Sequence, residues 1–316
     1  DLSNPEVVDV QTDSTLYWIL EYGLDGYRHD ATKHIQTDFW RTLTRKLKEQ
    51  VVVGQNRPIY QIGETYGSRD LIQSYIGSGL LDAQFDFNLY FEVRDVFAKD
   101  EPSFEVAVNS LQESFNYYGH HSTMGYITGN HDQSRFISLA GGDLAFDESP
   151  VEAGFAREIG VGDPIGYDRL QMLAGFLFSI PGIPVIYYGD EIGMPGAGDP
   201  DNRRMMRFDN LSEREAETLA VFRKLTALRS GRLSMTYGDT EILSYDDKSL
   251  ALARTWFDEL SVAVFNKSRE PQTVTFELPE RYAQTELSTH FDGKISREGK
   301  RVSVELPPWS FDMLTN

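Results

Sequence analysis

Residues 24–34 read LDGYRHDATKH, and this stretch decides the fold. Its first seven residues read as a short strand that ends in the carboxylate of Asp30. Phe39, Leu43 and Leu47 follow at four-residue spacing, which places an apolar stripe on one face of a helix. A strand followed by an amphipathic helix is the unit from which parallel α/β sheets are built.

The same unit recurs along the first two-thirds of the chain. Four further strands are predicted, at 59–63, 83–87, 125–129 and 183–187. Helices are predicted between them, at 71–76, 89–98, 104–118 and 167–178. Residues 141–164 are rich in Gly, Asp, Glu and Pro and are predicted to form an inserted loop. This part of the chain is therefore expected to be an α/β domain with a parallel sheet.

The pattern of the sequence changes after residue 231. Ser212, with Glu215 three residues later, is the predicted N-cap of a last long helix, 212–228. Short β-prone runs separated by turn residues follow, at 241–245, 250–255, 261–266, 272–278 and 302–306. Asp292-Gly293 predicts a two-residue hairpin between 286–291 and 294–296. We expect two domains, residues 1–231 and a carboxyl-terminal antiparallel β-sandwich of residues 232–316.

The composition disfavours several classes of protein. With 49 Asp plus Glu against 30 Lys plus Arg, the formal net charge is −19, which disfavours binding to nucleic acid or to an anionic membrane surface. Residues 172–189 carry no charge, but two prolines and a glycine interrupt them, so a buried helix end and strand are expected there instead of a membrane span. The chain has no cysteine and no visible secretory leader. Its location stays open, with a secreted or periplasmic one favoured over the cytoplasm.

Carboxylates stand at the carboxyl ends of three predicted strands. Asp30 ends the first, Glu64 follows Tyr-Gln-Ile-Gly, and Asp132 follows Asn130-His131 after the strand at 125–129. Enzymes of the barrel fold assemble their sites at such strand ends, so these three side chains are expected to converge in one cavity. Arg28 shares a strand face with Asp30 and would hold it ionised, whereas His29 points the other way and is expected to be a packed structural histidine.

Several short stretches resemble the ordered signatures of the α-amylase family, glycoside hydrolase family 13. DGYRHDATKH at 25–34, IGET at 62–65 and GNHD at 129–132 are similar to three of these signatures. SNPEV at 3–7 resembles the signature that precedes them, and GIPVIYYGDE at 182–191 resembles the last barrel strand of the family. The five occur in the family's order, and the resemblance spans nearly the whole chain.

This resemblance implies a retaining double displacement on α-1,4-linked glucans such as starch, maltooligosaccharides or cyclodextrins. Asp30 would be the nucleophile and Glu64 the general acid and base. Asp132 and His131 would hold sugar hydroxyls in the transition state, and Arg28 would keep Asp30 ionised. Retention predicts that the carboxyl groups of Asp30 and Glu64 lie about 5–5.5 Å apart, against about 6.5–9.5 Å for inversion.

Weaker matches suggest further contacts with substrate. Lys33 and His34 resemble a pair that contacts leaving-group sugars, with a solvated helix residue as the less favoured alternative for Lys33. Asp199 and Arg203 resemble residues that grip a sugar in cyclodextrin- and neopullulan-hydrolysing relatives, although a surface ion pair is an equal alternative. Four aromatic residues could stack on sugar rings but are more often core: Tyr66, Trp18, Tyr187 and Tyr188.

The chain departs from the family because its sequence opens at the signature that normally follows the third barrel strand. The expected fold is therefore the carboxyl-terminal part of a (β/α)8 barrel, strands 4 to 8, followed by the β-sandwich. Five strands cannot close a barrel, so we expect the amino-terminal portion of the same enzyme to be the partner of this chain. No cofactor is expected for the chemistry, and a structural calcium ion is an open possibility to which the backbone carbonyl of His34 could contribute.

Three functions compete at this point. An α-glucan hydrolase is favoured. A transglycosylase or isomerase of the same family would use the same three carboxylates. A non-catalytic glucan-binding relative would typically have damaged signatures, and Asp30, Glu64 and Asp132 are intact.

Overall fold

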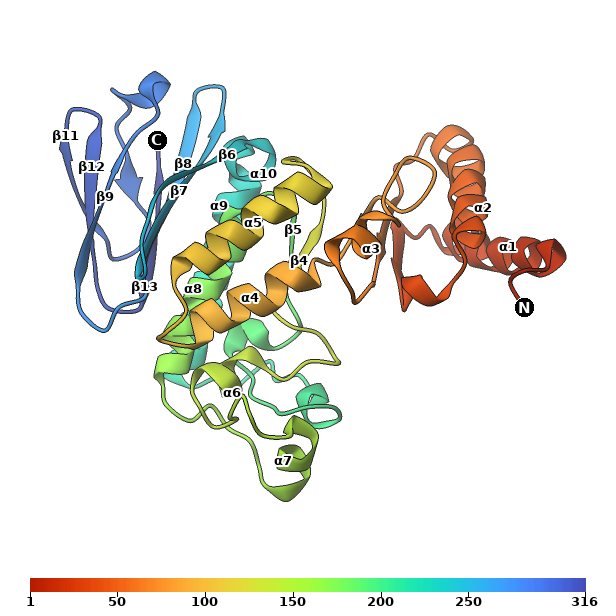
Figure 1. The fold of residues 1–316 in the computed structure, drawn as a ribbon, viewed down its shortest axis with the longest axis horizontal. Helices are drawn as coiled ribbons and strands as arrows, with labels where there is room; N and C mark the ends of the chain where they lie inside the picture. Colours follow the sequence, from red (N-terminus) through yellow and green to blue (C-terminus); the bar gives the residue numbers. More distant parts are fainter. The chain divides into compact units, whose positions relative to one another are not determined.

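A computed structural model describes residues 1–316 as an α/β protein with a β-rich carboxyl-terminal part. The chain forms two compact units (Figure 1). Unit 1 comprises residues 1–88 and 114–125, and unit 2 comprises residues 89–113 and 126–316.

Unit 1 is a small parallel sheet covered by helices. Its elements in chain order are α1 (Pro5–Tyr22), β1 (Gly26–His29), the 3₁₀ helix η1 (Thr32–His34), α2 (Thr37–Leu47), the π-helical η2 (Lys48–Val53), β2 (Tyr60–Gly63), α3 (Arg69–Gln73) and β3 (Ala83–Gln84). The strand order is β1-β2-β3. The pairs are parallel, with His29 opposite Gly63 and Gly63 opposite Gln84. The predicted parallel strands are therefore present, although each is shorter than its apolar run.

The core of unit 1 lies where α1 and α2 pack together. The predicted stripe of α2 is buried, with Leu43 0% and Leu47 1% exposed, against Leu16 and Ile19 of α1. Helix α1 itself was not predicted from the sequence. Apolar residues occur all round it, so that large ones such as Trp18 are exposed while others are buried, and no single stripe marks it as a helix.

The remaining elements of the α/β part include the predicted helices and strands in order, together with α6, α7 and α10, which were not predicted. They are α4 (Phe87–Ala98), α5 (Phe104–Tyr118), β4 (Gly125–Ile127), α6 (Phe136–Ala140), α7 (Pro150–Ala156), α8 (Ile165–Ser179), β5 (Ile183–Val185), η3 (Asp190–Ile192), η4 (Asp201–Arg203), α9 (Glu213–Gly231) and α10 (Leu233–Tyr237). A parallel bridge joins Phe85, just after β3, to Gly125 in β4, and β4 in turn pairs with β5.

Three details of the α/β part bear on the sequence predictions. The inserted loop at 141–164 is not wholly irregular, because Ser149 accepts a hydrogen bond from the Glu152 N–H and starts the short helix α7. Helix α9 begins with the predicted capping box between Ser212 and Glu215. The uncharged run 172–189 divides into the end of α8 and the strand β5, and no helix of the chain has both the length and the apolar character needed to span a bilayer.

The carboxyl-terminal part of unit 2 contains two antiparallel sheets (Figure 1). Its strands are β6 (Asp239–Tyr245), β7 (Ser249–Trp256), β8 (Glu259–Asn266), β9 (Gln272–Glu277), β10 (Ser288–Thr289), β11 (Lys294–Glu298), β12 (Arg301–Leu306) and β13 (Ser310–Thr315), with a 3₁₀ turn η5 (Glu280–Tyr282). One sheet has the order β10-β13-β8-β7-β6 and the other β11-β12-β9. Val262 and Val264 of the first sheet share a buried core with Val274 and Val304 of the second.

The predicted hairpin at Asp292-Gly293 is wrong. The segments on either side belong to different sheets, since β10 pairs with β13 and β11 pairs with β12. The buried carboxylate of Asp312 in β13 accepts hydrogen bonds from the N–H groups of His290 (2.8 Å), Phe291 (3.0 Å) and Gly293 (2.7 Å). This long-range anchor bends the chain from one sheet to the other, and a local turn motif cannot reveal it.

Candidate active site

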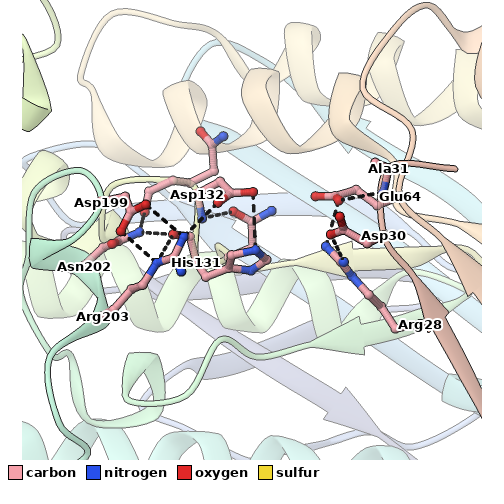
Figure 2. Close-up of polar contacts among 11 residues, drawn as sticks. Arg28, Asp30, Ala31, Glu64, His131, Asp132, Asp199, Asn202 and Arg203 are labelled. Carbon is pink, nitrogen blue, oxygen red and sulfur yellow. Dashed lines mark hydrogen bonds and ion pairs between the residues drawn. The ribbon is translucent and has the colours of Figure 1, made fainter. Parts of the chain in front are cut away.

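In unit 1, one arginine joins the carboxylates at the ends of two strands (Figure 2). Arg28 lies in β1, Asp30 follows β1 directly, and Glu64 follows β2. The Arg28 Nη1 contacts Asp30 Oδ1, and its Nη2 lies 2.8 Å from Glu64 Oε2. The side chain of Asp30 is 74% exposed and that of Glu64 15% exposed. The two acids therefore share one guanidinium, and Asp30 is open to an incoming substrate.

Backbone hydrogen bonds fix the two strand ends relative to each other. The Glu64 N–H donates to the His29 carbonyl at 2.9 Å, and the Thr32 N–H donates to the Glu64 carbonyl at 2.8 Å. Gly63 allows this close approach, since a Cβ there would lie 2.6 Å from Thr32 Oγ1 and 2.3 Å from Gln84 Nε2. A side chain at position 63 would push the backbone at Glu64 away from the backbone at Asp30.

His29 faces away from Arg28 and Asp30, as strand alternation requires. It is 9% exposed, and its Nε2 lies 3.1 Å from Gln61 Oε1. Its ring centroid lies 4.7 Å from that of Trp40 in α2. Burial lowers the pKa of the His29 imidazole to about 4, so the ring is neutral at neutral pH.

In unit 2, a second polar group surrounds Asp132 (Figure 2). The Arg203 Nη2 donates to Asp132 Oδ1 at 3.2 Å and to Asp199 Oδ2 at 3.0 Å. The His131 Nε2 lies 3.4 Å from Asp132 Oδ2, and the Asp132 N–H donates to Asn130 Oδ1 at 2.9 Å. The structure thus brings Asp132, His131, Asp199 and Arg203 together, all partly exposed.

Asn202 holds the backbone on both sides of Asp132, and its role was missed from the sequence. It is 0% exposed, and its Nδ2 donates to the carbonyls of His131 (2.7 Å) and Gln133 (2.8 Å). Arg203 Nε also donates to the His131 carbonyl at 3.1 Å. Nothing in the local sequence marks Asn202, because its partners lie about seventy residues earlier in the chain.

Known proteins resemble this chain over nearly its whole length. The family model for the alpha-amylase catalytic domain matches residues 1–227. The chain belongs to the alpha-amylase family. A cyclomaltodextrinase of Geobacillus thermopakistaniensis is 26% identical over 98% of this chain and 48% of its own length. Neopullulanase 2 of Thermoactinomyces vulgaris is 29% identical over 99% of this chain and 48% of its own length.

Solved structures of the alpha-amylase family show the same fold. An Anoxybacillus alpha-amylase superimposes with a TM-score of 0.80 at 28% identity, covering 100% of this chain and 64% of that one. The present chain spans about half the length of the curated relatives named above. About half of each of these relatives therefore lies outside the part that this chain matches.

In this alpha-amylase family member, a buried ion pair between Arg135 and Asp190 supports Asn202, which holds the backbone around Asp132. Arg135 Nη1 donates to Asp190 Oδ1 at 2.9 Å, and Arg135 Nε donates to the Asn202 carbonyl at 3.0 Å. Thr128 Oγ1 donates to Asp190 Oδ2 at 2.5 Å. Arg135 and Asp190 are 2% and 3% exposed, so they act as scaffold and not as substrate contacts. They were not predicted, because only the fold brings residues 135 and 190 together.

The residues with weaker family resemblance divide into two groups. Lys33 donates from Nζ to the Tyr66 carbonyl at 2.7 Å and lies 5.7 Å from the Tyr66 ring centroid. His34 and Tyr66 are exposed. Tyr187 and Tyr188 instead contact Arg135, whose guanidinium lies 3.9 and 4.8 Å from their ring centroids. Burial raises the pKa of Tyr187 to about 12. The Tyr187 ring packs against the Arg135 guanidinium.

Trp18 belongs to an exposed aromatic cluster on α1. Its ring stacks on Tyr22 at 5.2 Å between centroids, and Tyr17 lies 5.7 Å away edge-on. As for calcium, no group of three or more His, Cys, Asp or Glu side chains is arranged to hold a metal ion. A site that used the His34 carbonyl would need oxygen ligands from elsewhere.

Proposed function

We propose that this chain is part of a retaining α-glucan hydrolase that cleaves α-1,4-glucosidic bonds of starch, maltooligosaccharides or cyclodextrins. The observation that carries the proposal is the Arg28 bridge between Asp30 and Glu64, in a chain that matches the alpha-amylase catalytic domain. One guanidinium that binds both acids keeps them close, as a retaining mechanism requires.

Asp30 acts as the nucleophile in this proposal. Its carboxylate attacks C1 of the glucose unit at the scissile bond, the C1–O bond breaks, and Glu64 gives its proton to the leaving oxygen. In the second step Glu64 takes a proton from water, the water oxygen bonds to C1, and the bond between C1 and Asp30 breaks. Two inversions at C1 leave the α-configuration unchanged. Arg28 favours the ionised Asp30 by opposite charge and directed hydrogen bonds.

Asp132 and His131 bind sugar hydroxyl groups, and their hydrogen bonds strengthen in the transition state. Arg203 and Asp199 contact a neighbouring sugar. Arg203 also orients Asp132, to which it is bonded. Lys33, His34 and Tyr66 contact sugars beyond the point of cleavage.

We infer that the five strands β1 to β5 are the last five of a (β/α)8 barrel, within residues 1–231. The strand order β1-β2-β3, the Phe85–Gly125 bridge and the β4-β5 pair support this inference. The first three strands would come from an amino-terminal portion of the same enzyme, since the relatives are about twice as long. Residues 232–316, with two sheets around one core, would form the β-sandwich domain.

Product analysis of the full-length protein tests the proposal. It should release maltooligosaccharides from soluble starch or open β-cyclodextrin, and Asp30→Asn should lose turnover while still binding maltoheptaose. Asn116→Ala, at an exposed position of α5, is the matched control and should remain active. Longer transfer products in place of hydrolysis products would indicate a transglycosylase, and unchanged turnover of Asp30→Asn would refute the nucleophile assignment.

A further inference from the structure

His29 stands between two residues of the candidate active site but belongs to a different layer of the molecule. It is the last residue of β1, with Arg28 before it and Asp30 after it. Its side chain is buried on the face of the sheet that α2 covers, between Tyr27 at 5.4 Å and Trp40 at 4.7 Å between ring centroids. No step of the proposed chemistry uses this titratable group.

A chain of buried hydrogen bonds fixes which ring nitrogen of His29 carries the hydrogen when the ring is neutral. Thr44 of α2 donates to the Leu80 carbonyl at 2.8 Å, because a carbonyl can only accept. The Thr44 oxygen then accepts from Gln61 Nε2 at 3.0 Å, which leaves Gln61 Oε1 to accept from His29 Nε2 at 3.1 Å. This order of donors assigns the neutral tautomer with hydrogen on Nε2.

The backbone of His29 connects this network to both acids. Its carbonyl accepts from the Glu64 N–H at 2.9 Å and from Thr32 Oγ1 at 3.3 Å. Thr32 Oγ1 also lies 3.0 Å from the Glu64 nitrogen. Asp30 is the next residue in the chain. A displacement of His29 therefore moves the backbone at Asp30 and at Glu64 together.

We propose that neutral His29 is a positioning residue, which anchors the end of β1 to Gln61 and α2 and so sets the geometry of the Asp30–Arg28–Glu64 group. The inference rests on the proposed function of that group. Protonation would place a cation in this buried layer, and the Arg28 guanidinium on the opposite face of the sheet would add like-charge repulsion. The titratable groups of its own strand are Tyr27, in the same layer, and Arg28, on the opposite face of the sheet. Gln61, Thr44 and Trp40, from β2 and α2, are uncharged. Nothing in that layer balances the added charge.

Two substitutions separate positioning from simple packing. His29→Leu fills the space but cannot donate, so Gln61 Oε1 loses its partner, and kcat/KM on maltoheptaose should fall by about tenfold or more. His29→Gln keeps an N–H near the Nε2 position and cannot titrate in this range, so it should restore kcat/KM to within about threefold of the wild type. In the profile of kcat/KM against pH, the fall on the acidic side (the acid limb) should lie about one pH unit lower for His29→Gln than for the wild type.

The experiment measures kcat/KM of the full-length protein from pH 2 to pH 8, with far-UV circular dichroism at each pH to follow folding. His120→Gln, at an exposed histidine of unit 1, is the control and should keep the wild-type profile. Gln61→Leu removes the bond to His29 and also the bond to Thr44, so it should lose at least as much as His29→Leu, and the double variant should lose no more than Gln61→Leu.

The outcomes are distinguishable. If the wild type is active and His29→Gln has the same acid limb, this inference alone is overturned. The same holds if the variants lose activity only where they unfold. A folded wild type that cleaves no glucan at any pH overturns the proposed function and this inference with it. If His29→Leu does not fold, the shift of the acid limb in His29→Gln still decides the question.

Discussion

Replacing Asn202 with alanine should separate the stability of this protein from its activity. The substitution removes the two hydrogen bonds that hold the carbonyls of His131 and Gln133. The Gln133 carbonyl loses its Asn202 donor, whereas the His131 carbonyl still accepts from Arg203 Nε at 3.1 Å. The loop that carries Asp132 is then held on one side only.

The cost in stability follows from these contacts. Two hydrogen bonds are lost at about 1 kcal/mol each, but the substitution also removes Asn202 Oδ1, a buried atom without a hydrogen-bond partner. The free energy of unfolding should therefore fall by about 1–2 kcal/mol. A domain of ordinary stability, about 5–15 kcal/mol, stays almost wholly folded after such a loss.

The cost in activity should be larger. A misplacement of a catalytic group by about 1 Å can lower the rate about 100-fold, so we expect kcat/KM on maltoheptaose to fall by about 30- to 100-fold. Urea unfolding and steady-state kinetics of the full-length protein give the two quantities, with Asn116→Ala as the control. A kcat/KM within about twofold of the wild type would refute the argument that Asn202 positions Asp132.

Three further predictions concern stability. The pKa of His29 is about 4 in the folded chain and about 6.5 in the unfolded chain, so the unfolded chain binds more protons between these values. The free energy of unfolding should therefore fall by about 3 kcal/mol from pH 6.5 to pH 4. Urea titrations should show that the free energy of unfolding of His29→Gln depends less steeply on pH. Ser212→Ala removes one half of the capping box of α9 and should cost about 1 kcal/mol in urea unfolding, and a loss below about 0.3 kcal/mol would contradict the role of the cap. Asp312→Asn replaces acceptor oxygens that bind three N–H groups and should cost about 2 kcal/mol, which thermal unfolding can measure; an unchanged midpoint would show that the bend from β10 to β11 does not depend on this carboxylate.

Local patterns predicted those elements whose cause is local. The stripe of Phe39, Leu43 and Leu47 specifies α2 within the chain segment itself, and the capping box of Ser212 and Glu215 starts α9. The alternation of side chains on a strand likewise separated His29 from Arg28. In each case the residues that determine the structure lie within a few positions of one another.

Elements whose cause is distant could not be predicted. The turn at Asp292-Gly293 has the composition of a hairpin, yet Asp312 in β13 directs it between two sheets. The Arg135–Asp190 ion pair joins residues far apart in the chain. Helix α1 carries apolar residues on several sides, so its periodicity does not distinguish the buried face. These features depend on packing that a single sequence does not display.

The same limit applies to the candidate site. The motifs indicated Asp30, Glu64 and Asp132 because each follows a strand, and the structure places Arg28 against the first two. Sequence reasoning did not find Asn202, which orients the loop of the third, because an asparagine next to Arg203 has no special signature by itself. Residues that position others are found from their contacts.

Trapping of the covalent intermediate tests the central claim most directly. In the Glu64→Gln variant of the full-length protein, α-maltosyl fluoride can still react, because fluoride leaves without help from an acid, whereas the base for the second step is absent. The account predicts that peptide mass spectrometry finds a maltosyl group on the carboxylate of Asp30. A maltosyl group on another residue, or turnover to a product of inverted configuration without any covalent adduct, would contradict it.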